Sequence, residues 1–225
     1  MTHRFVHCKG GNGGIGREKP GILPRPGLRD GGPPCEEKHM PDTQPAEPPI
    51  HTKEAFLAWL DRAGLPYETR HHEPLHTVEE AQAARAAWGP DWAGGGHCKN
   101  LFLKDKKGAL FLIVTLEERE LKLNRLSKPI GSARLSFGNA DLMWEKLGVR
   151  PGSVTPFAVV NDMKGEITVI LDEPMLAHER LHYHPLENTA TTAISRDDLL
   201  RFLRLTGHEP LVIDLVAAQG AEGDE

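Results

Sequence analysis

The first periodic segment of the chain predicts a helix followed by a strand. Apolar residues recur at helical spacing from Phe56 to Leu60. Thr52 can cap this helix at its start, and Gly64 is placed to end it. Residues 67–71 then predict a short strand.

An alanine-rich segment predicts a second helix before a glycine-rich turn. Thr77 and Glu80 have the spacing of a capping box, and the helix should end by Gly89. The three consecutive glycines 94–96 predict a mobile turn that breaks just before Lys99.

Two pairs of apolar runs predict β-hairpins. Residues 101–104 and 109–116 flank a short connection rich in turn formers, and the second run is apolar enough for a central strand. Residues 157–160 and 167–171 also flank a turn, so we expect a second hairpin there. A charged helix is expected at 118–127.

The rest of the pattern adds short strands and two capped helices. Asn139 can cap a helix at 140–147 with Gly148 as its stop, and Ser195 can cap a helix through Leu203. The remaining strands are expected at 134–137, 181–184, 189–194 and 211–215. The fold class is therefore α+β: a single domain at residues 51–217, with a mixed, mostly antiparallel β-sheet flanked by helices.

Both ends of the chain are expected to lie outside this domain. Residues 1–50 contain nine Gly, nine Pro and a single aromatic residue, Phe5, which is too little apolar surface to offset the conformational entropy of folding. We therefore expect a disordered tail there, and a flexible C-terminus at 218–225. Met40 raises the hypothesis that translation starts near the end of the tail.

Charge makes wholesale electrostatic binding to a nucleic-acid duplex unfavourable. From position 51 onward the chain has 20 Lys and Arg residues against 26 Asp and Glu residues. A local cluster of lysines at positions 99, 104, 106 and 107 could still hold a few phosphates. Partner binding should therefore be local.

The cysteines and the apolar runs suggest a soluble cytoplasmic protein. The three cysteines, Cys8, Cys35 and Cys98, form no CxxC pair, so neither a disulfide framework nor a zinc ribbon is supported. No apolar run approaches 18 residues and no signal-peptide core is present, so we expect no membrane insertion and no secretion.

Three other chemical motifs are set aside. The glycines at 11–16 match the spacing of a dinucleotide fingerprint, but no strand precedes them and no helix follows. Two histidine groups, at 71, 72 and 76 and at 178, 182 and 184, lack cysteine or carboxylate ligands at metal spacing. Cys98 has only a sequence neighbour, His97, to activate it as a nucleophile.

Three polar segments at strand ends suggest a site. Lys99 enters a strand directly after the glycines and is followed by Asn100, which has both a donor and an acceptor. The second segment is Gly152, Ser153, Val154, Thr155 and Pro156, and the third contains His184 and Asn188. By themselves, these residues could equally be solvated charges and ordinary turns.

The same three segments resemble a known family. Residues 99–108 (KNLFLKDKKG), 152–157 (GSVTPF) and 184–191 (HPLENTAT) look like the hallmark segments of the YbaK/prolyl-tRNA synthetase editing-domain superfamily, nearest to its free-standing ProXp-ala (PrdX) branch. The resemblance covers roughly residues 51–215. It implies trans-editing, which is hydrolysis of alanine wrongly attached to tRNA(Pro), with no cofactor and no metal.

The resemblance also assigns roles to the residues. Lys99 occupies the position of the family's essential lysine, residues 152–156 match its glycine-to-proline substrate loop, and His184 matches the histidine of its pocket. Asn100 and Asn188 are carried over as substrate-positioning groups. The implied partner is the acceptor end of tRNA(Pro) carrying alanine.

The chemistry suits such a modest set of groups, because an aminoacyl ester is already activated and needs positioning more than a strong nucleophile. The ribose hydroxyl beside the ester can assist the attacking water. Two alternatives stay open from sequence. The protein could deacylate a cysteinyl, seryl or threonyl ester, since one hydroxyl changes binding by only about 1–3 kcal/mol, or it could be a non-catalytic regulator that binds tRNA.

Overall fold

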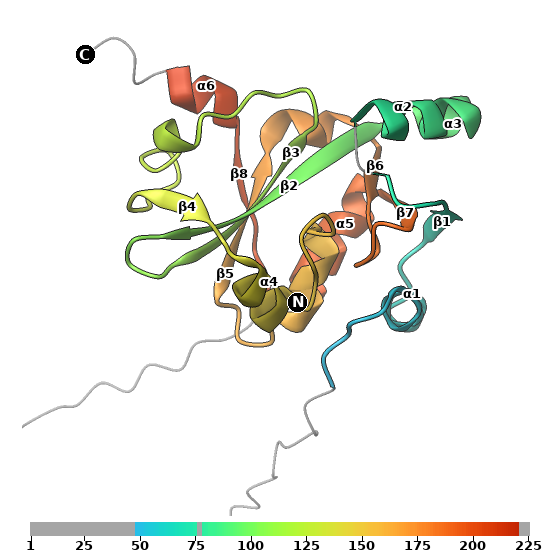
Figure 1. Cartoon of the computed structure of the whole chain (residues 1–225), viewed down its shortest axis with the longest axis horizontal. Coiled ribbons are helices and arrows are strands. Elements are labelled where there is room, and N and C mark those ends of the chain that lie inside the picture. Colours follow the sequence, from blue (N-terminus) through green and yellow to red (C-terminus); the bar gives the residue numbers. More distant parts are fainter. Residues whose placement is uncertain (1–47, 76–77, 221–225) are drawn as a thin grey trace, which may run out of the picture. The chain divides into compact units, whose positions relative to one another are not determined.

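The computed structural model describes residues 48–75 and 78–220 (Figure 1). Strands from distant parts of this segment lie side by side, with helices around them. The helices are α1 (Lys53–Arg62), α2 (Val78–Ala87), α3 (Pro90–Ala93), α4 (Ala140–Leu147), α5 (Arg196–Leu205) and α6 (Leu215–Gly220). The 3-10 helices are η1 (Leu123–Arg125), η2 (Pro156–Asn161) and η3 (Glu173–Ala177).

The strands of the described residues join in one mixed sheet. Its order is β1-β7-β6-β2-β3-β5-β8, and β4 pairs with β2 outside that path. Pairs β1–β7, β6–β7, β2–β3 and β2–β4 are antiparallel, whereas β2–β6, β3–β5 and β5–β8 are parallel. The strands are β1 (Tyr67–His71), β2 (Gly96–Asp105), β3 (Leu110–Leu116), β4 (Leu135–Phe137), β5 (Ile167–Asp172), β6 (Arg180–Tyr183), β7 (Ala190–Ser195) and β8 (Leu211–Ile213). The mixed, mostly antiparallel sheet predicted from sequence is confirmed.

Strand β2 is the longest strand described, and it has two different partners on one edge. Its first residues, Gly96 and His97, pair with β6, and residues 103–105 near its end pair with β4. Its other edge pairs with β3 from Cys98 to Lys104. Between the β6 and β4 pairings, among the described residues, the middle of β2 has an edge without a neighbouring strand. That opening is where the candidate site lies.

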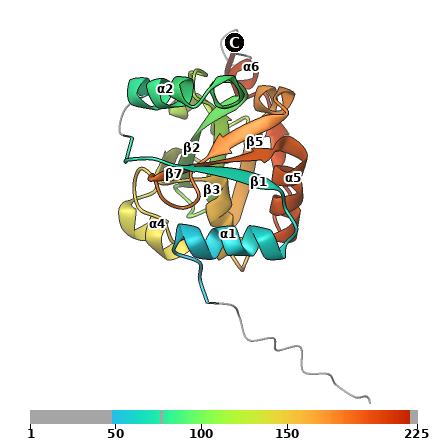
Figure 2. The same cartoon turned by 90° about the vertical axis from the view of Figure 1, so that its right-hand side faces the viewer.

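Strand β3 separates two clusters of buried apolar side chains. Leu112 and Val114 point into a cluster that contains Phe56 of α1 and Phe202 of α5. Ile113 points into the opposite cluster, together with residues from the segment after η1 and from α6. All seven residues of β3 are buried, which confirms the predicted central strand. Figure 2 shows α1 and α5 beside the sheet edge formed by β1 and β7.

The predicted helix caps are largely confirmed. The side chains of Thr52, Asn139 and Ser195 accept hydrogen bonds from backbone amides in the first turns of α1, α4 and α5. Gly148 ends α4 in the left-handed conformation with φ of +67°. The proposed cap Thr77 lies outside the described residues.

The second predicted hairpin is wrong. Residues 156–161 form the 3-10 helix η2, and β5 pairs in parallel with β3. Proline at position 156 fits the first turn of a helix, and the side chain of Thr155 accepts a hydrogen bond from the amide of Phe157. A buried apolar run without alternation fits a strand or a helix equally well.

Two other local predictions are also wrong. The charged helix expected at 118–127 is reduced to η1, a single 3-10 turn. The glycine turn expected at 94–96 is shorter, because Gly96 is already the first residue of β2. Lys99 therefore lies within the strand, three residues after its start.

The ends of the folded part differ slightly from the predicted boundaries. Ile50 is buried, and its backbone exchanges two hydrogen bonds with the Asn161 side chain, at 2.7 and 2.8 Å. Residues 218–220 belong to α6. Residues 1–47 of the predicted tail and residues 221–225 lie outside the described part. Within that part, no helix has the length and apolar character needed to cross a membrane.

Candidate functional site

A cavity of about 420 Å³ opens beside the middle of β2. Its walls come from β2, from helix α2 on one side, and from β6, β7 and the loop before η2 on the other. The lining residues are Leu75, Ala81, Arg85, Trp88, His97, Cys98, Lys99, Asn100, Glu117, Gly152, His182, Tyr183, His184 and Thr191. Four residues predicted from sequence are therefore brought together: Lys99, Asn100, Gly152 and His184.

Lys99 is held by backbone carbonyl groups. Its ammonium donates to the carbonyl oxygen of Glu117, at 3.1 Å, and to that of Arg119. Both carbonyls belong to the segment that leaves β3. An ammonium has three N–H donors, so these two bonds fix its position and leave one donor for a ligand in the cavity.

Asn100 presents an unpaired oxygen. Its side-chain nitrogen donates to the carbonyl oxygen of Val154 at 3.0 Å. Because a carbonyl can only accept, this bond fixes which end of the amide faces the loop. The Oδ1 atom is buried and has no hydrogen-bond partner among the described residues. A buried acceptor without a partner is costly, which suggests that a ligand donor satisfies it.

His184 is held in one tautomer. Its Nδ1 atom lies 2.9 Å from the carbonyl oxygen of Ala190, so Nδ1 carries the proton and donates. Burial lowers the pKa of His184 and outweighs the opposing effect of that hydrogen bond. The ring is therefore neutral at pH 7, and Nε2 is a hydrogen-bond acceptor.

An ion pair joins α2 to the segment that follows β3. The guanidinium of Arg85 makes two hydrogen bonds to the carboxylate of Glu117, at 2.7 and 3.2 Å. The backbone oxygen of the same Glu117 accepts from Lys99. One residue at the end of β3 thus positions both the helix and the lysine ammonium.

The segment 152–156 divides between the cavity and the core. Gly152 lines the cavity with φ of +89°, a conformation that favours glycine. Val154 contributes its carbonyl oxygen to Asn100, and the side chains of Thr155 and Pro156 are buried where η2 begins. Ser153 is also buried.

The last predicted site residue lies apart from the others. Asn188 is half-buried in the connection between β6 and β7 and is not among the residues that line the cavity. His184 and Thr191, at the two ends of the same connection, do line it.

The glycines before Lys99 have a packing reason rather than a ligand-binding one. A Cβ atom on Gly95 would lie 2.7 Å from the carbonyl oxygen of Arg180 and 2.9 Å from the His182 ring. A Cβ on Gly96 would lie 2.6 Å from a methyl group of Leu181. These residues are glycines because β2 begins tightly packed against β6.

Cys98 is unsuited to act as a nucleophile. Burial raises the pKa of its thiol to about 12, so the reactive thiolate is negligible at neutral pH. The neighbouring His97 does not activate it, since its ring instead stacks on His182, with centroids 4.5 Å apart.

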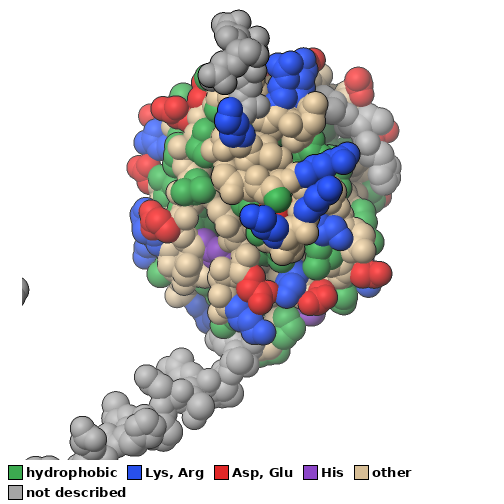
Figure 3. Space-filling model, turned by 90° about the vertical axis from the view of Figure 1, so that its left-hand side faces the viewer, with side chains coloured by type: hydrophobic (Ala, Val, Ile, Leu, Met, Phe, Trp, Pro, Cys, Tyr) green, Lys and Arg blue, Asp and Glu red, His purple; other side chains and the backbone are tan. Residues whose placement is uncertain are grey.

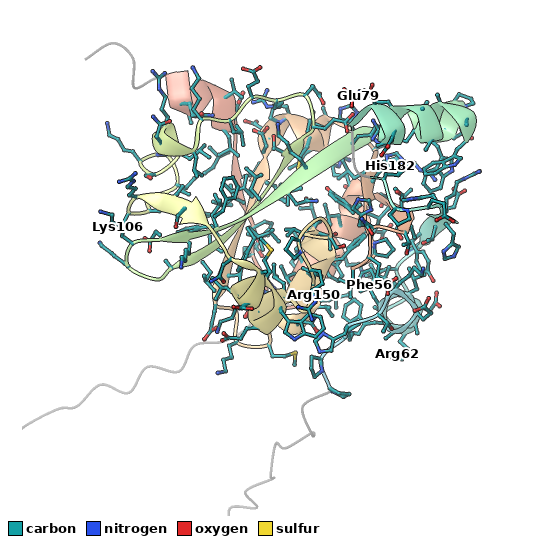
Figure 4. All side chains as sticks on the ribbon, viewed as in Figure 1. Phe56, Arg62, Glu79, Lys106, Arg150 and His182 are labelled. Carbon is teal, nitrogen blue, oxygen red and sulfur yellow. The ribbon has the colours of Figure 1, made fainter. Side chains whose placement is uncertain are left out.

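The histidines split between separate environments. His182 is buried against Trp92 of α3, and Figure 4 shows it beside the start of β2. Burial lowers its pKa to about 3, so it is neutral. His76 lies outside the described part. Across residues 48–75 and 78–220, no group of three or more His, Cys, Asp or Glu side chains is placed to hold a metal ion.

Sequence reasoning missed several residues of the cavity wall. Arg85 of α2, Trp88 just after that helix and Glu117 just after β3 line the cavity, as do Tyr183 of β6 and Thr191 of β7. None lies in the three polar segments. Tyr183 precedes His184 in the sequence, but neighbouring side chains of a strand point to opposite faces, so the pattern gives no signal for it. The position of α2 depends on long-range contacts.

The part of the chain that forms the cavity is similar to known proteins. The family model for the aminoacyl-tRNA editing domain matches residues 72–202. The chain is 35% identical over 167 residues to prolyl-tRNA synthetase associated domain-containing protein 1 of Danio rerio, covering 73% of this chain and 88% of the relative. It is 32% identical over 167 residues to prolyl-tRNA editing protein ProX of Acetoanaerobium sticklandii, covering 74% and 99%.

Solved structures share the fold. One is the crystal structure of a candidate trans-editing enzyme for prolyl tRNA synthetase, with a TM-score of 0.56 and 21% sequence identity. The match covers 74% of this chain and 98% of that one. At this level of identity the likeness extends to the fold alone.

Proposed function

Because the chain belongs to the aminoacyl-tRNA editing domain family, we propose that it is a cytoplasmic trans-editing deacylase that hydrolyses mischarged Ala-tRNA(Pro). The products are alanine and free tRNA(Pro). One observation carries the proposal: Lys99 and Asn100 line the same cavity. The Lys99 ammonium is a fixed donor there, and the buried Oδ1 atom of Asn100 is an acceptor without a partner among the described residues.

These two groups fit the polar atoms of an aminoacyl ester. The free N–H of Lys99 can donate to the ester carbonyl or to a phosphate of the terminal nucleotide. The Oδ1 atom of Asn100 can accept from the α-ammonium of the amino acid or from a ribose hydroxyl. Val154, which holds the other end of the Asn100 amide, fixes the direction of that acceptor.

Hydrolysis needs a water molecule and one proton transfer. Water adds to the ester carbonyl carbon, the bond from this carbon to the ribose oxygen breaks, and the ribose oxygen takes a proton. The neutral Nε2 of His184 can accept a hydrogen bond from the water or from the adjacent ribose hydroxyl, which can itself assist. Lys99 stabilises the negative charge that develops on the carbonyl oxygen.

The preference for alanine rests on size. The cavity has apolar and aromatic walls, including Trp88 and Tyr183, that can exclude the larger proline ring. Such walls discriminate weakly between alanine and serine, because one hydroxyl is worth only about 1–3 kcal/mol in an apolar pocket.

The test is hydrolysis of tRNA(Pro) charged separately with alanine, cysteine, serine, threonine and proline. We expect the alanyl ester to be hydrolysed fastest and the prolyl ester to be spared. Lys99→Ala should lower kcat/KM for the alanyl ester by about 100-fold or more. Lys104→Ala, on the same strand but outside the cavity, should leave the rate on a small alanyl ester unchanged.

Each part of the proposal can fail separately. If another ester is hydrolysed faster, its amino acid and not alanine is the preferred substrate. If the protein binds tRNA but hydrolyses no ester, the result would favour the alternative function of a non-catalytic tRNA-binding regulator. Full activity in Lys99→Ala would remove the role proposed for the ammonium.

A further inference from the structure

A surface far from the cavity concentrates positive charge on an otherwise acidic molecule. We call it the basic surface and define it by Lys104, Lys106, Lys107, Arg125, Lys128 and Arg134. Figure 3 shows Lys and Arg side chains gathered on the face that carries β4 and the β2–β3 turn. These six are drawn from only 20 basic residues after position 50, where acidic residues number 26.

Acidic residues are scarce in the segments that form this surface. Residues 121–140 contain no Asp or Glu, and residues 96–116 contain only Asp105. The carboxylate of Asp105 is buried and turns inward, where it accepts hydrogen bonds from the amides of Lys107, Ala109 and Ala133 at 2.8 to 3.0 Å. These two segments therefore present mainly positive charge to solvent, and an acidic side chain from another segment, Glu166, lines a shallow pocket together with Lys104 and Lys146.

The fold holds these cations in place. The amide of Lys106 donates to the carbonyl oxygen of Arg134 at 3.1 Å, and β4 pairs with the end of β2. The turn η1, which contains Arg125, packs against β4. Within the described part of the chain, Lys104, Lys106, Lys107, Arg125 and Arg134 form no ion pair with a carboxylate. Their charges remain available to a polyanion.

One exposed aromatic ring lies among these cations. Phe137 ends β4 and is 61% exposed, which is unusual for an aromatic side chain. An exposed ring beside Lys and Arg suits the stacking of an unpaired base or contact with ribose. A single ring is too little apolar surface to hold a membrane.

The basic surface and the cavity lie along the same strand. Lys104 lies five positions beyond Lys99 along β2, a rise of about 17 Å at the usual spacing. A ligand that fills the cavity and also reaches the basic surface must be an extended polyanion. RNA satisfies both conditions.

We propose that the basic surface binds the sugar–phosphate backbone of tRNA beyond the acceptor end, while the aminoacyl group occupies the cavity. This rests on the proposed function for the identity of the RNA. The lysine cluster predicted from sequence, at positions 99, 104, 106 and 107, is thereby divided. Lys99 lines the cavity, and the other three lysines belong to the basic surface together with arginines from later segments.

The test compares two matched double variants. Arg125→Ala/Arg134→Ala removes two charges from the basic surface, and Arg62→Ala/Arg204→Ala removes two exposed charges from α1 and α5. Figure 4 places Lys106 of the basic surface and Arg62 on opposite sides of the molecule. Binding of uncharged tRNA(Pro) transcript is followed by fluorescence anisotropy over a series of KCl concentrations.

The basic-surface variant should bind at least about fivefold more weakly at low salt. The slope of its plot of log K against log [KCl] should be shallower than that of the wild type by about two. For Ala-tRNA(Pro), KM should rise while kcat stays unchanged. Hydrolysis of 3′-O-alanyl adenosine, which cannot reach the basic surface, should not change. The control variant should match the wild type throughout.

A second variant keeps the proposal testable if the first fails to fold. Lys106→Gln/Lys107→Gln alters only exposed turn side chains and should reduce the slope in the same way. Wild-type affinity and slope in the folded variants would overturn the proposal. So would binding of the wild type to phosphatidylserine vesicles but not to tRNA.

The two proposals fail in different ways. If the wild type binds tRNA through the basic surface but hydrolyses no ester, the proposed function is wrong and the proposal for the basic surface is supported. If the wild type hydrolyses Ala-tRNA(Pro) and the basic-surface variants are unchanged, only the basic surface falls.

Discussion

At the scale of single residues, neighbouring side chains of β2 have opposite environments. Lys99 is bound by two carbonyl groups at the end of β3, whereas Asn100 reaches across the strand edge to the loop before η2. Cys98, one residue earlier, is a half-buried neutral thiol. Alternation along the strand places Lys99 on one face of the sheet and Cys98 and Asn100 on the other.

His184 predicts how kcat/KM depends on pH. Burial lowers its pKa below the ordinary value of about 6.5, so the neutral form dominates at pH 7 and persists into mildly acidic solution. If Nε2 accepts from the attacking water, kcat/KM should stay level from pH 8 to about 6.5 and fall at lower pH as the ring becomes protonated. Steady-state rates on Ala-tRNA(Pro) measure this profile.

The matched variants are His184→Gln and His71→Gln. The first should lower the rate and flatten the acidic limb, whereas the second changes an exposed histidine of β1 and should keep the wild-type profile. An acidic limb that survives unchanged in His184→Gln would show that another group titrates.

At the scale of elements, the start of β2 decides where Lys99 lies. Gly95 has φ of +83° and packs against β6, so β2 and β6 approach closely at Gly96 and diverge afterwards. The divergence creates the edge that η2 and its preceding loop approach. Helix α2 closes the other side through the bond from Arg85 to Glu117.

The prediction for this element concerns Gly95→Ala. The added methyl would meet the Arg180 carbonyl and the His182 ring in a backbone conformation that alanine disfavours. We expect the free energy of unfolding in urea to fall by about 2–4 kcal/mol, from overpacking together with strain.

Gly165→Ala is the control. Gly165 also has positive φ, at +62°, but a Cβ atom added there would meet no atom within 4 Å. Strain alone should lower its stability by about 1 kcal/mol. Equal losses in the two variants would mean that contact with β6 does not constrain Gly95.

At the scale of the whole molecule, buried polar groups join segments that are distant in sequence. Asp162 follows η2 and accepts from the amides of Glu166 and Ile167, at 3.0 and 2.7 Å. The Nε2 atom of His208, beyond α5, lies 3.1 Å from the same carboxylate. Asn161 links the start of the described chain, at Ile50, to the end of α4.

Asp162 predicts how global stability depends on pH. Burial raises the pKa of this carboxyl, but its hydrogen bonds from His208 and the two amides outweigh burial and hold the pKa below its ordinary value. A lowered folded-state pKa stabilises the fold above about pH 4, and this stabilisation is lost as pH falls through the folded-state value.

Asp162→Asn should therefore have a lower Tm than the wild type at pH 6, and the difference should shrink toward pH 3. Thermal unfolding followed by circular dichroism measures both. Asp141→Asn, which changes an exposed carboxyl of α4, is the control and should lower the Tm at pH 6 by less than Asp162→Asn does. A constant difference for Asp162→Asn would contradict the assignment.

How far the sequence predicted this molecule depends on the range of the interactions involved. Helix α4, with Asn139 before it and Gly148 after it, is set by contacts within a few residues, and it was predicted correctly. The segment 157–160 has local signals only at its start, the Thr155 cap and Pro156, and its apolar run fits a strand as well as a helix. It packs in the core among residues from α1 and α5. The candidate site divides in the same way, because motifs identified Lys99 and His184 while Arg85 and Glu117 reach the cavity only through the packing of α2.

The sequence alone determined the helix caps, the hairpin of β2 and β3 and the three polar segments, since each depends on residues close together in the chain. Only the tertiary structure decided that β5 lies parallel to β3, that Gly95 packs on β6, and that Arg125 and Arg134 join Lys106. Those arrangements depend on backbone pairing and close packing between distant segments, which local patterns do not encode.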